Sequence, residues 1–184
     1  MWEASGTKTL EDQMPFYAAD HQGPRNKATH FIGVTAIAVS LLIPLSWLRI
    51  DAGGITVTGA LVVTSVLLAY YLLLDIPLGL AMCALFGLAL CATDPIAKAP
   101  LATGLAWFLV LFISGWIVQP WGHVYESMKP ALVDNLFQVF VAPILLAAEV
   151  FFALGYKPQL YQSVQKRALK MRAVALNSGA RSAA

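Results

Sequence analysis

The run FIGVTAIAVSLLIPLSWL, residues 31–48, decides the fold class, because it holds eighteen consecutive residues without a charged side chain. A helix needs roughly 17–25 mainly apolar residues to cross a hydrocarbon core of about 30 Å. Three more uncharged runs of sufficient length follow, at residues 52–74, 76–93 and 99–122. An isolated strand leaves backbone polar groups unpaired in lipid, so each run is predicted to be a helix. We therefore predict an all-α, polytopic membrane helical bundle with four transmembrane helices.

The composition supports a membrane protein. The chain of 184 residues is 59% hydrophobic and only 12% charged, whereas a soluble domain carries roughly a quarter charged residues. Most of the charged residues lie in the first 30 positions, in short connectors or after Tyr156. The net charge of +2 is small and no basic stripe is present, so we expect the lipid bilayer, and no nucleic acid, as a partner.

A fifth apolar run, residues 135–156, contains Pro143 and Glu149. An ionisable group near the middle of a membrane costs about 2.5–3.5 kcal/mol, so Glu149 either pairs with Lys157 or a backbone donor or has a functional role. Both ends of the chain are rich in Lys and Arg, and the positive-inside rule places such ends in the cytoplasm. Four spans satisfy that rule and five do not. We therefore predict a re-entrant or interfacial helical segment bent at Pro143, in a multi-pass protein of a bacterial inner membrane or the endoplasmic reticulum.

These runs divide the chain into three segments. Residues 1–15 are expected to form a flexible N-terminal leader, and residues 16–156 the membrane-embedded catalytic domain. Residues 157–184 are expected to form a basic polar helix, over residues 158–174, and a disordered tail.

The three histidines of the chain are predicted to lie at the same membrane face. His21 and His30 precede the first span, and His123 follows the fourth. An even number of spans returns the chain to its starting side of the bilayer, whereas an odd number would keep these imidazoles apart. The span count alone therefore allows them to meet.

Local spacing adds a polar partner to each histidine before the first span. Tyr17 and His21 are four residues apart, as are Asn26 and His30, so each pair shares one face of a helix. Gly23-Pro24 separates the pairs, and proline is well suited to begin a new helix. The break permits the two histidines to turn toward each other.

Carboxylates accompany the third histidine. His123 and Glu126 form a His-x-x-Glu pair, and Asp20 and Asp134 add further oxygen donors. Imidazoles with a carboxylate and open positions are typical of non-haem Fe(II) sites. Against this, an interfacial histidine is commonly just a polar residue facing headgroups, and Asn26 can simply cap a helix. The joint occurrence of all three histidines at one face favours a metal site.

Two other classes of protein stay open. In a small membrane transporter or channel, the histidines would relay protons, but we find no convincing inverted repeat, and the polar candidate residues lie at one face rather than at mid-depth. In a zinc-dependent hydrolase acting on lipids, His123 and Glu126 would belong to the zinc site. The metal content of the purified protein separates the three hypotheses.

Two motifs resemble those of a known family. They are YAADHQGPRNKATHFIGV at residues 17–34 and GHVYESMKPALVDN at residues 122–135. Together, with apolar spans between them, they are similar to the signature of the yeast-type 2-hydroxy-fatty-acid dioxygenases, membrane enzymes of fatty-acid α-oxidation. The resemblance covers residues 16–149. It implies an Fe(II)-dependent enzyme that converts a 2-hydroxy fatty acid and O₂ to the fatty acid one carbon shorter.

The resemblance also implies roles for individual residues. His21, His30 and His123 would be the iron ligands. Glu126 would be a fourth ligand or would anchor an imidazole, and Asn26 would hydrogen-bond near the ligands. Further candidates for contacts near the metal or the substrate are Tyr17 and Asp134. Arg25, Lys27 or Lys129 could attract the substrate carboxylate, and Lys129 is our choice because it neighbours the His-x-x-Glu turn.

Overall fold

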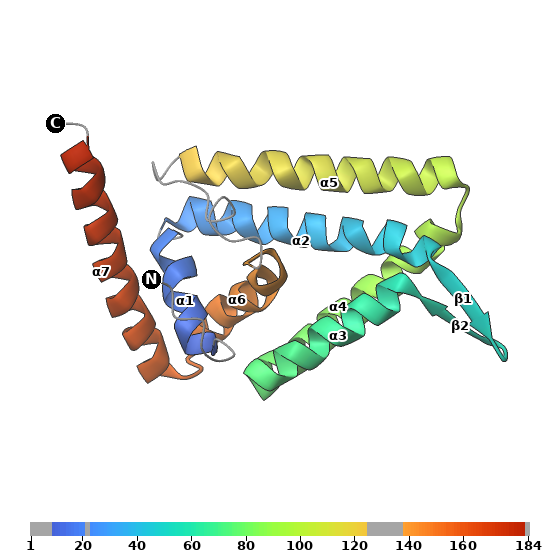
Figure 1. Ribbon diagram of the computed structural model, residues 1–184, viewed down its shortest axis with the longest axis horizontal. Coiled ribbons are helices and arrows are strands. Elements are labelled where there is room, and N and C mark those ends of the chain that lie inside the picture. Colours follow the sequence, from blue (N-terminus) through green and yellow to red (C-terminus); the bar gives the residue numbers. More distant parts are fainter. Residues whose placement is uncertain (1–8, 21–22, 125–137, 183–184) are drawn as a thin grey trace.

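The structure is a computed structural model that describes residues 9–20, 23–124 and 138–182. These ranges form a helical bundle with one β-hairpin (Figure 1), which confirms the predicted all-α class. The helices are α1 (Leu10–Asp20), α2 (Pro24–Trp47), α3 (Gly59–Leu74), α4 (Ile76–Lys98), α5 (Leu101–Val124), α6 (Gln138–Ala153) and α7 (Pro158–Ser182), and the strands are β1 (Arg49–Ala52) and β2 (Ile55–Thr58).

Three of the described helices are long and apolar enough to cross a membrane, namely α2, α4 and the part of α5 up to Gln119. Helix α3 is apolar but has only 16 residues, a length of about 24 Å. The pair α6 and α7 passes the same test only together, with a bend of 119° between them. Three of the four predicted spans are therefore long enough to cross a membrane. The second predicted span, which corresponds to α3, is shorter than predicted.

The second span is short because a hairpin replaces its beginning. Strands β1 and β2 pair antiparallel around Gly53 and Gly54, whose φ angles of 59° and 85° suit glycine. The Thr and β-branched apolar residues of β2 favour a strand. Residues 52–58, which we expected inside a helix, therefore lie in the hairpin. Helix α3 begins only after Thr58, whose hydroxyl oxygen accepts a hydrogen bond from the Leu61 amide.

Helix α6 continues through Pro143, so the predicted helical hairpin does not reverse at that residue. Proline in the second turn removes a single backbone hydrogen bond. The chain reverses instead after Ala153, where Gly155 and Lys157 adopt positive φ angles of 87° and 45°. Lys157 Nζ donates to the buried Asp75 Oδ2 over 2.7 Å. Asp75 also accepts from the Leu78 amide and thereby caps α4, so the α6–α7 turn is fixed to the α3–α4 turn.

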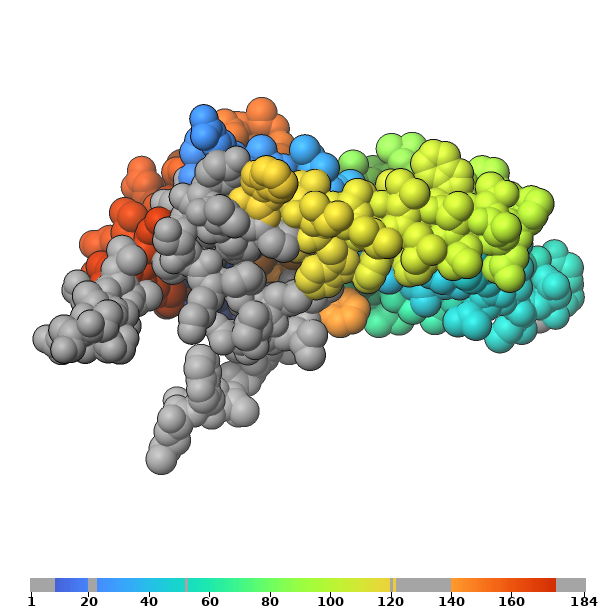
Figure 2. All heavy atoms as spheres, turned by 90° about the horizontal axis from the view of Figure 1, so that it is seen from above, coloured from blue at the N-terminus to red at the C-terminus, as the bar shows by residue number. Residues whose placement is uncertain are grey.

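Helices α2 and α5 pack closely along their lengths. A Cβ atom on Gly33 would lie 2.9 Å from the Gly115 carbonyl oxygen and 2.6 Å from Gln119 Cγ. At the other end of the pair, a Cβ atom on Gly104 would lie 3.1 Å from the Trp47 ring. The helices are therefore antiparallel, and small residues let their backbones approach as in many membrane bundles. The other side of α5 lies along the outer surface (Figure 2).

The two ends of the chain cover one end of the bundle. Helix α1 begins at Leu10, within the expected leader, because Leu10 and Met14 are buried in the apolar core. Helix α7 runs across the same end of the bundle (Figure 1) and buries Val164 and Ala168. It continues to Ser182, beyond the expected start of a disordered tail.

Candidate functional site

A group of largely buried polar side chains lies where the beginning of α2 meets α1 and α6. This buried polar group consists of Tyr17, Asn26, Lys27, His30 and Glu149. Asn26 is completely buried, and His30, one turn later on α2, is only 6% exposed. The break predicted at Gly23-Pro24 is confirmed, since α2 begins at Pro24. The predicted four-residue spacing therefore places both side chains on the buried side of the first spanning helix.

The His30 imidazole has its tautomer fixed by the backbone. Its Nδ1 atom lies 3.2 Å from the Asn26 carbonyl oxygen. A carbonyl oxygen only accepts, so Nδ1 donates its hydrogen, and in the neutral imidazole the lone pair then lies on Nε2. This is the arrangement that orients a metal-binding histidine in many proteins.

The backbone of His123 lies at the level of His30. Gly33 contacts Gln119 across the α2–α5 interface. His30 lies three residues before Gly33, and His123 lies four residues after Gln119, in antiparallel helices. Both residues are therefore about one turn beyond the same contact, toward the same end of the bundle. The expectation that these two histidines share one face is consistent with this register.

An ion pair next to His30 joins α2 to α6. Lys27 Nζ lies 2.6 Å from Glu149 Oε2, and the two side chains are 25% and 10% exposed. The second carboxylate oxygen, Oε1, is buried and has no hydrogen-bond partner among the described residues. Of the two alternatives for Glu149, pairing with Lys157 does not occur, because Lys157 binds Asp75. The sequence did indicate the site, because Glu149 is an ionisable residue inside an apolar run.

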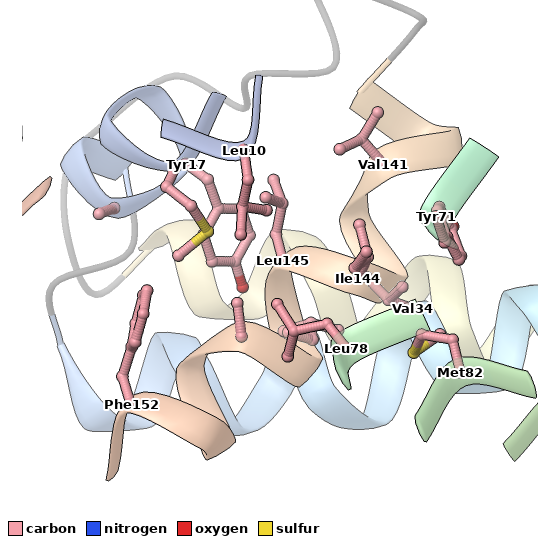
Figure 3. Packing of buried hydrophobic residues seen from close by; sticks show 14 of the residues in the cluster. Leu10, Tyr17, Val34, Tyr71, Leu78, Met82, Val141, Ile144, Leu145 and Phe152 are labelled. Carbon is pink, nitrogen blue, oxygen red and sulfur yellow. The ribbon is translucent and has the colours of Figure 1, made fainter. Parts of the chain in front are cut away.

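Tyr17 approaches this ion pair from α1. Its side chain is buried and projects into the cluster beside Leu145 of α6 (Figure 3). Burial, and secondly the negative charge of Glu149, raise the pKa of the Tyr17 phenol above its ordinary value. The phenol therefore stays protonated and is available as a hydrogen-bond donor.

The other predicted site residues lie outside the described part of the chain. His21, Glu126, Lys129 and Asp134 fall in residues 21–22 and 125–137, and the side chain of His123 is not described either. Within the ranges that are described, no three His, Cys, Asp or Glu residues are placed to hold a metal ion. The complete ligand set stays a prediction.

Comparison with known proteins places these residues in a family. Residues 7–154 match the family model described as "2-hydroxy-palmitic acid dioxygenase Mpo1-like". The chain belongs to the Mpo1-like family. A curated relative, the "2-hydroxy-palmitic acid dioxygenase MPO1" of Saccharomyces cerevisiae, is 36% identical over 168 residues, which cover 87% of this chain and 90% of the yeast protein. No solved structure matches the chain.

The Mpo1-like match contains the whole buried polar group. It includes α1 with Tyr17, α2 with Lys27 and His30, and α6 with Glu149, and it ends at residue 154. Helix α7 follows the matched region. The resemblance read from the two motifs is thus confirmed, and the Lys27–Glu149 pair joins the candidate site residues inside the family region.

Proposed function

We propose that this protein is an Fe(II)-dependent dioxygenase that converts a 2-hydroxy fatty acid and O₂ to the fatty acid one carbon shorter. The observation that supports this most strongly is the match along 87% of the chain to a protein named as a 2-hydroxy-palmitic acid dioxygenase. A membrane enzyme suits this substrate, because the acyl chain can stay among the helices while the polar head reaches one end of the bundle.

In this proposal, His30 binds the iron through Nε2, together with His21, His123 and the carboxylate of Glu126. The residue that the structure describes fits the role, since His30 is buried and its Nδ1 donates to a backbone carbonyl. Imidazole and carboxylate donors with open positions suit Fe(II). When bound, the iron would supply positions at which the 2-hydroxy acid and O₂ can meet.

Lys27 is the described residue best placed to bind the substrate carboxylate. It lies three residues before His30 on α2, and Glu149 holds its ammonium group over 2.6 Å. An ammonium group has three donors, so contact with Glu149 leaves others for a second carboxylate. The neutral Tyr17 phenol adds a donor near the same pair. These contacts support Lys27, which the sequence offered beside Arg25 and Lys129, as a group that orients the substrate.

A turnover assay tests the proposed function. Purified protein with Fe(II) and O₂ should convert 2-hydroxypalmitate to the fifteen-carbon acid, detected by mass spectrometry, and an iron chelator should abolish the product. His30→Ala should be inactive while retaining its helical circular dichroism. Ser114→Ala should keep full activity, because the exposed Ser114 hydroxyl bonds only within α5 to the Leu111 carbonyl.

Three results would contradict the proposal. They are product formation that survives the chelator, full activity of the folded His30→Ala protein, and zinc in place of iron in active protein purified anaerobically. The last result would favour the lipid hydrolase.

A further inference from the structure

An apolar groove lies between α2, α4 and α6, with a volume of about 290 Å³. Each helix lines it with residues spaced three or four apart, within residues 31–39, 81–89 and 143–151. Each of the three helices therefore presents one continuous stripe to the same space. The volume lies at the lower end of the range of about 300–1,000 Å³ that is typical of small-molecule sites.

The groove begins beside the candidate site. On α2 its lining starts at Phe31, directly after His30, and continues with Val34, one turn beyond His30 on the same face. On α6 it includes Val150, directly after Glu149. The polar group and the apolar groove are therefore continuous along two helices.

The apolar side chains that line the groove favour a hydrocarbon ligand. Among the described residues that line the groove, Thr35 alone has a polar side-chain oxygen or nitrogen atom, and the remainder are aliphatic, aromatic, Met or Pro side chains. A charged or strongly polar ligand would lose its hydration there without gaining hydrogen bonds. From Phe31 to Val39 the α2 wall extends for about 12 Å, so the groove is elongated along the helix.

The deep end of the groove can be placed from the ends of α2 and α4. Arg49, just after α2, lies 3.8 Å from Asp94 near the end of α4. Since His30 lies at the beginning of α2, the later residues of both helices are the more distant ones. The deep part of the lining therefore includes Ala38 of α2 and the buried Phe86 of α4.

We propose that this groove binds the acyl chain of the 2-hydroxy fatty acid, and that Ala38 and Phe86 limit the chain length accepted. The inference rests on the proposed function for the identity of the polar head, whose carboxylate would lie toward Lys27 and His30. The occupant follows from the groove itself, which is apolar, elongated and next to the polar group along α2 and α6.

Chain-length selectivity of two variants and a control tests the groove. Ala38→Phe should fill the deep end, so the ratio of kcat/KM for 2-hydroxypalmitate to that for 2-hydroxyoctanoate should fall about tenfold or more. Phe86→Ala should shift the preference toward acids longer than sixteen carbons. Ala84→Phe is the matched control, because Ala84 lies on α4 outside the lining and is exposed. Its ratio should equal that of the wild type.

A binding measurement separates failure of the groove from failure of the proposed function. Displacement of a fluorescent polyene fatty acid by palmitate should be seen with wild type and with Ala84→Phe, and should weaken about tenfold with Ala38→Phe. This result would support the groove even if no 2-hydroxy acid were turned over. An active Ala38→Phe protein with unchanged selectivity and unchanged displacement would overturn the groove and leave the proposed function intact.

Discussion

Lys27 and Glu149 form an ion pair whose carboxylate side chain is only 10% exposed, as the Asp75 carboxylate is buried in its pair with Lys157. Charges removed from water lose hydration energy, and a buried pair recovers this loss only when its geometry is good. The distance of 2.6 Å between Nζ and Oε2 meets that condition for one oxygen, whereas Oε1 receives no hydrogen bond from the described residues. A carboxylate left half satisfied beside a buried histidine suits a functional role better than a purely structural one.

Removing one member of this pair should therefore be costly. Lys27→Met leaves Glu149 without its counter-ion, so we expect the free energy of unfolding to fall by about 3 kcal/mol. Lys27→Met with Glu149→Leu should recover most of that loss while activity stays low. Denaturant unfolding in detergent measures both effects. Lys98→Met, in the exposed pair with Asp94, is the control and should change stability by less than about 1 kcal/mol. Equal effects at the two pairs would contradict the buried role of Lys27.

The sequence predicted some residues of the candidate site but not the contacts between them. The four-residue spacing of Asn26 and His30 predicted a shared helix face, because such spacing depends only on local geometry. The contact of Lys27 with Glu149 joins residues 122 positions apart. Nothing local distinguishes Lys27 from Lys157 as the partner of Glu149. Only the packing of α6 against α2 decides between them.

Among the elements, α2 and α5 approach each other most closely at Gly33 and Gly115. Gly33 and Gly115 allow the two backbones to meet, and this contact fixes the register that brings the backbone of residue 123 to the level of residue 30. In lipid, helices gain little from hydrophobic burial against each other, so close packing is a main source of their association. The candidate site is thus assembled by two glycines that lie outside it.

A side chain at Gly33 should push the helices apart. Gly33→Ala places Cβ within 3 Å of both Gln119 and the Gly115 carbonyl, so we expect a loss of about 1–3 kcal/mol in stability together with reduced turnover. Gly87→Ala, at a position of α4 where Cβ meets nothing within 4 Å, is the matched control. It should leave turnover unchanged and stability equal or up to about 1 kcal/mol higher. Similar behaviour of the two variants would argue against a tight α2–α5 contact.

The apolar runs predicted the helices better than their ends. Hydropathy and the absence of charged residues located α2, α4 and α5, because the main requirement for a spanning helix is a sufficiently long apolar run. The same criterion extended the second run through Gly53-Gly54 into the hairpin, since uncharged β-branched residues raise hydropathy in strands as in helices. We predicted that the helical segment would turn at Pro143, but helix α6 continues through that residue. The turn lies after Ala153 instead, where Gly155 has a positive φ angle.

On the scale of the whole molecule, the described residues separate into two ends. Helices α1 and α7 and the beginning of α2 lie at one end, and the β-hairpin lies at the other (Figure 1). If α2 crosses the bilayer once, the candidate site and the hairpin are on opposite sides of it. The basic residues of α7, including Lys166 and Lys170, are exposed at the first end. From the positive-inside rule we predict that this end lies in the cytoplasm.

Labelling of single cysteines in sealed vesicles tests this arrangement. In a background with Cys83 and Cys91 replaced by Ala, Arg25→Cys and Leu169→Cys should react with an impermeant maleimide from the cytoplasmic side. Ile55→Cys, on the exposed hairpin, should react only from the other side. Opening the vesicles with detergent, as a control, should label all three. Labelling of positions 25 and 55 from the same side would contradict the predicted topology.

The most direct test of the proposed site is the iron content of protein purified anaerobically, compared among wild type, His30→Ala, His123→Ala and the double variant. We predict about one iron per wild-type chain, a large loss in either single variant, and no further loss in the double variant, because one ion is held by both helices. Full iron in both folded single variants, or losses that add in the double variant, would contradict a metal shared between the beginning of α2 and the end of α5.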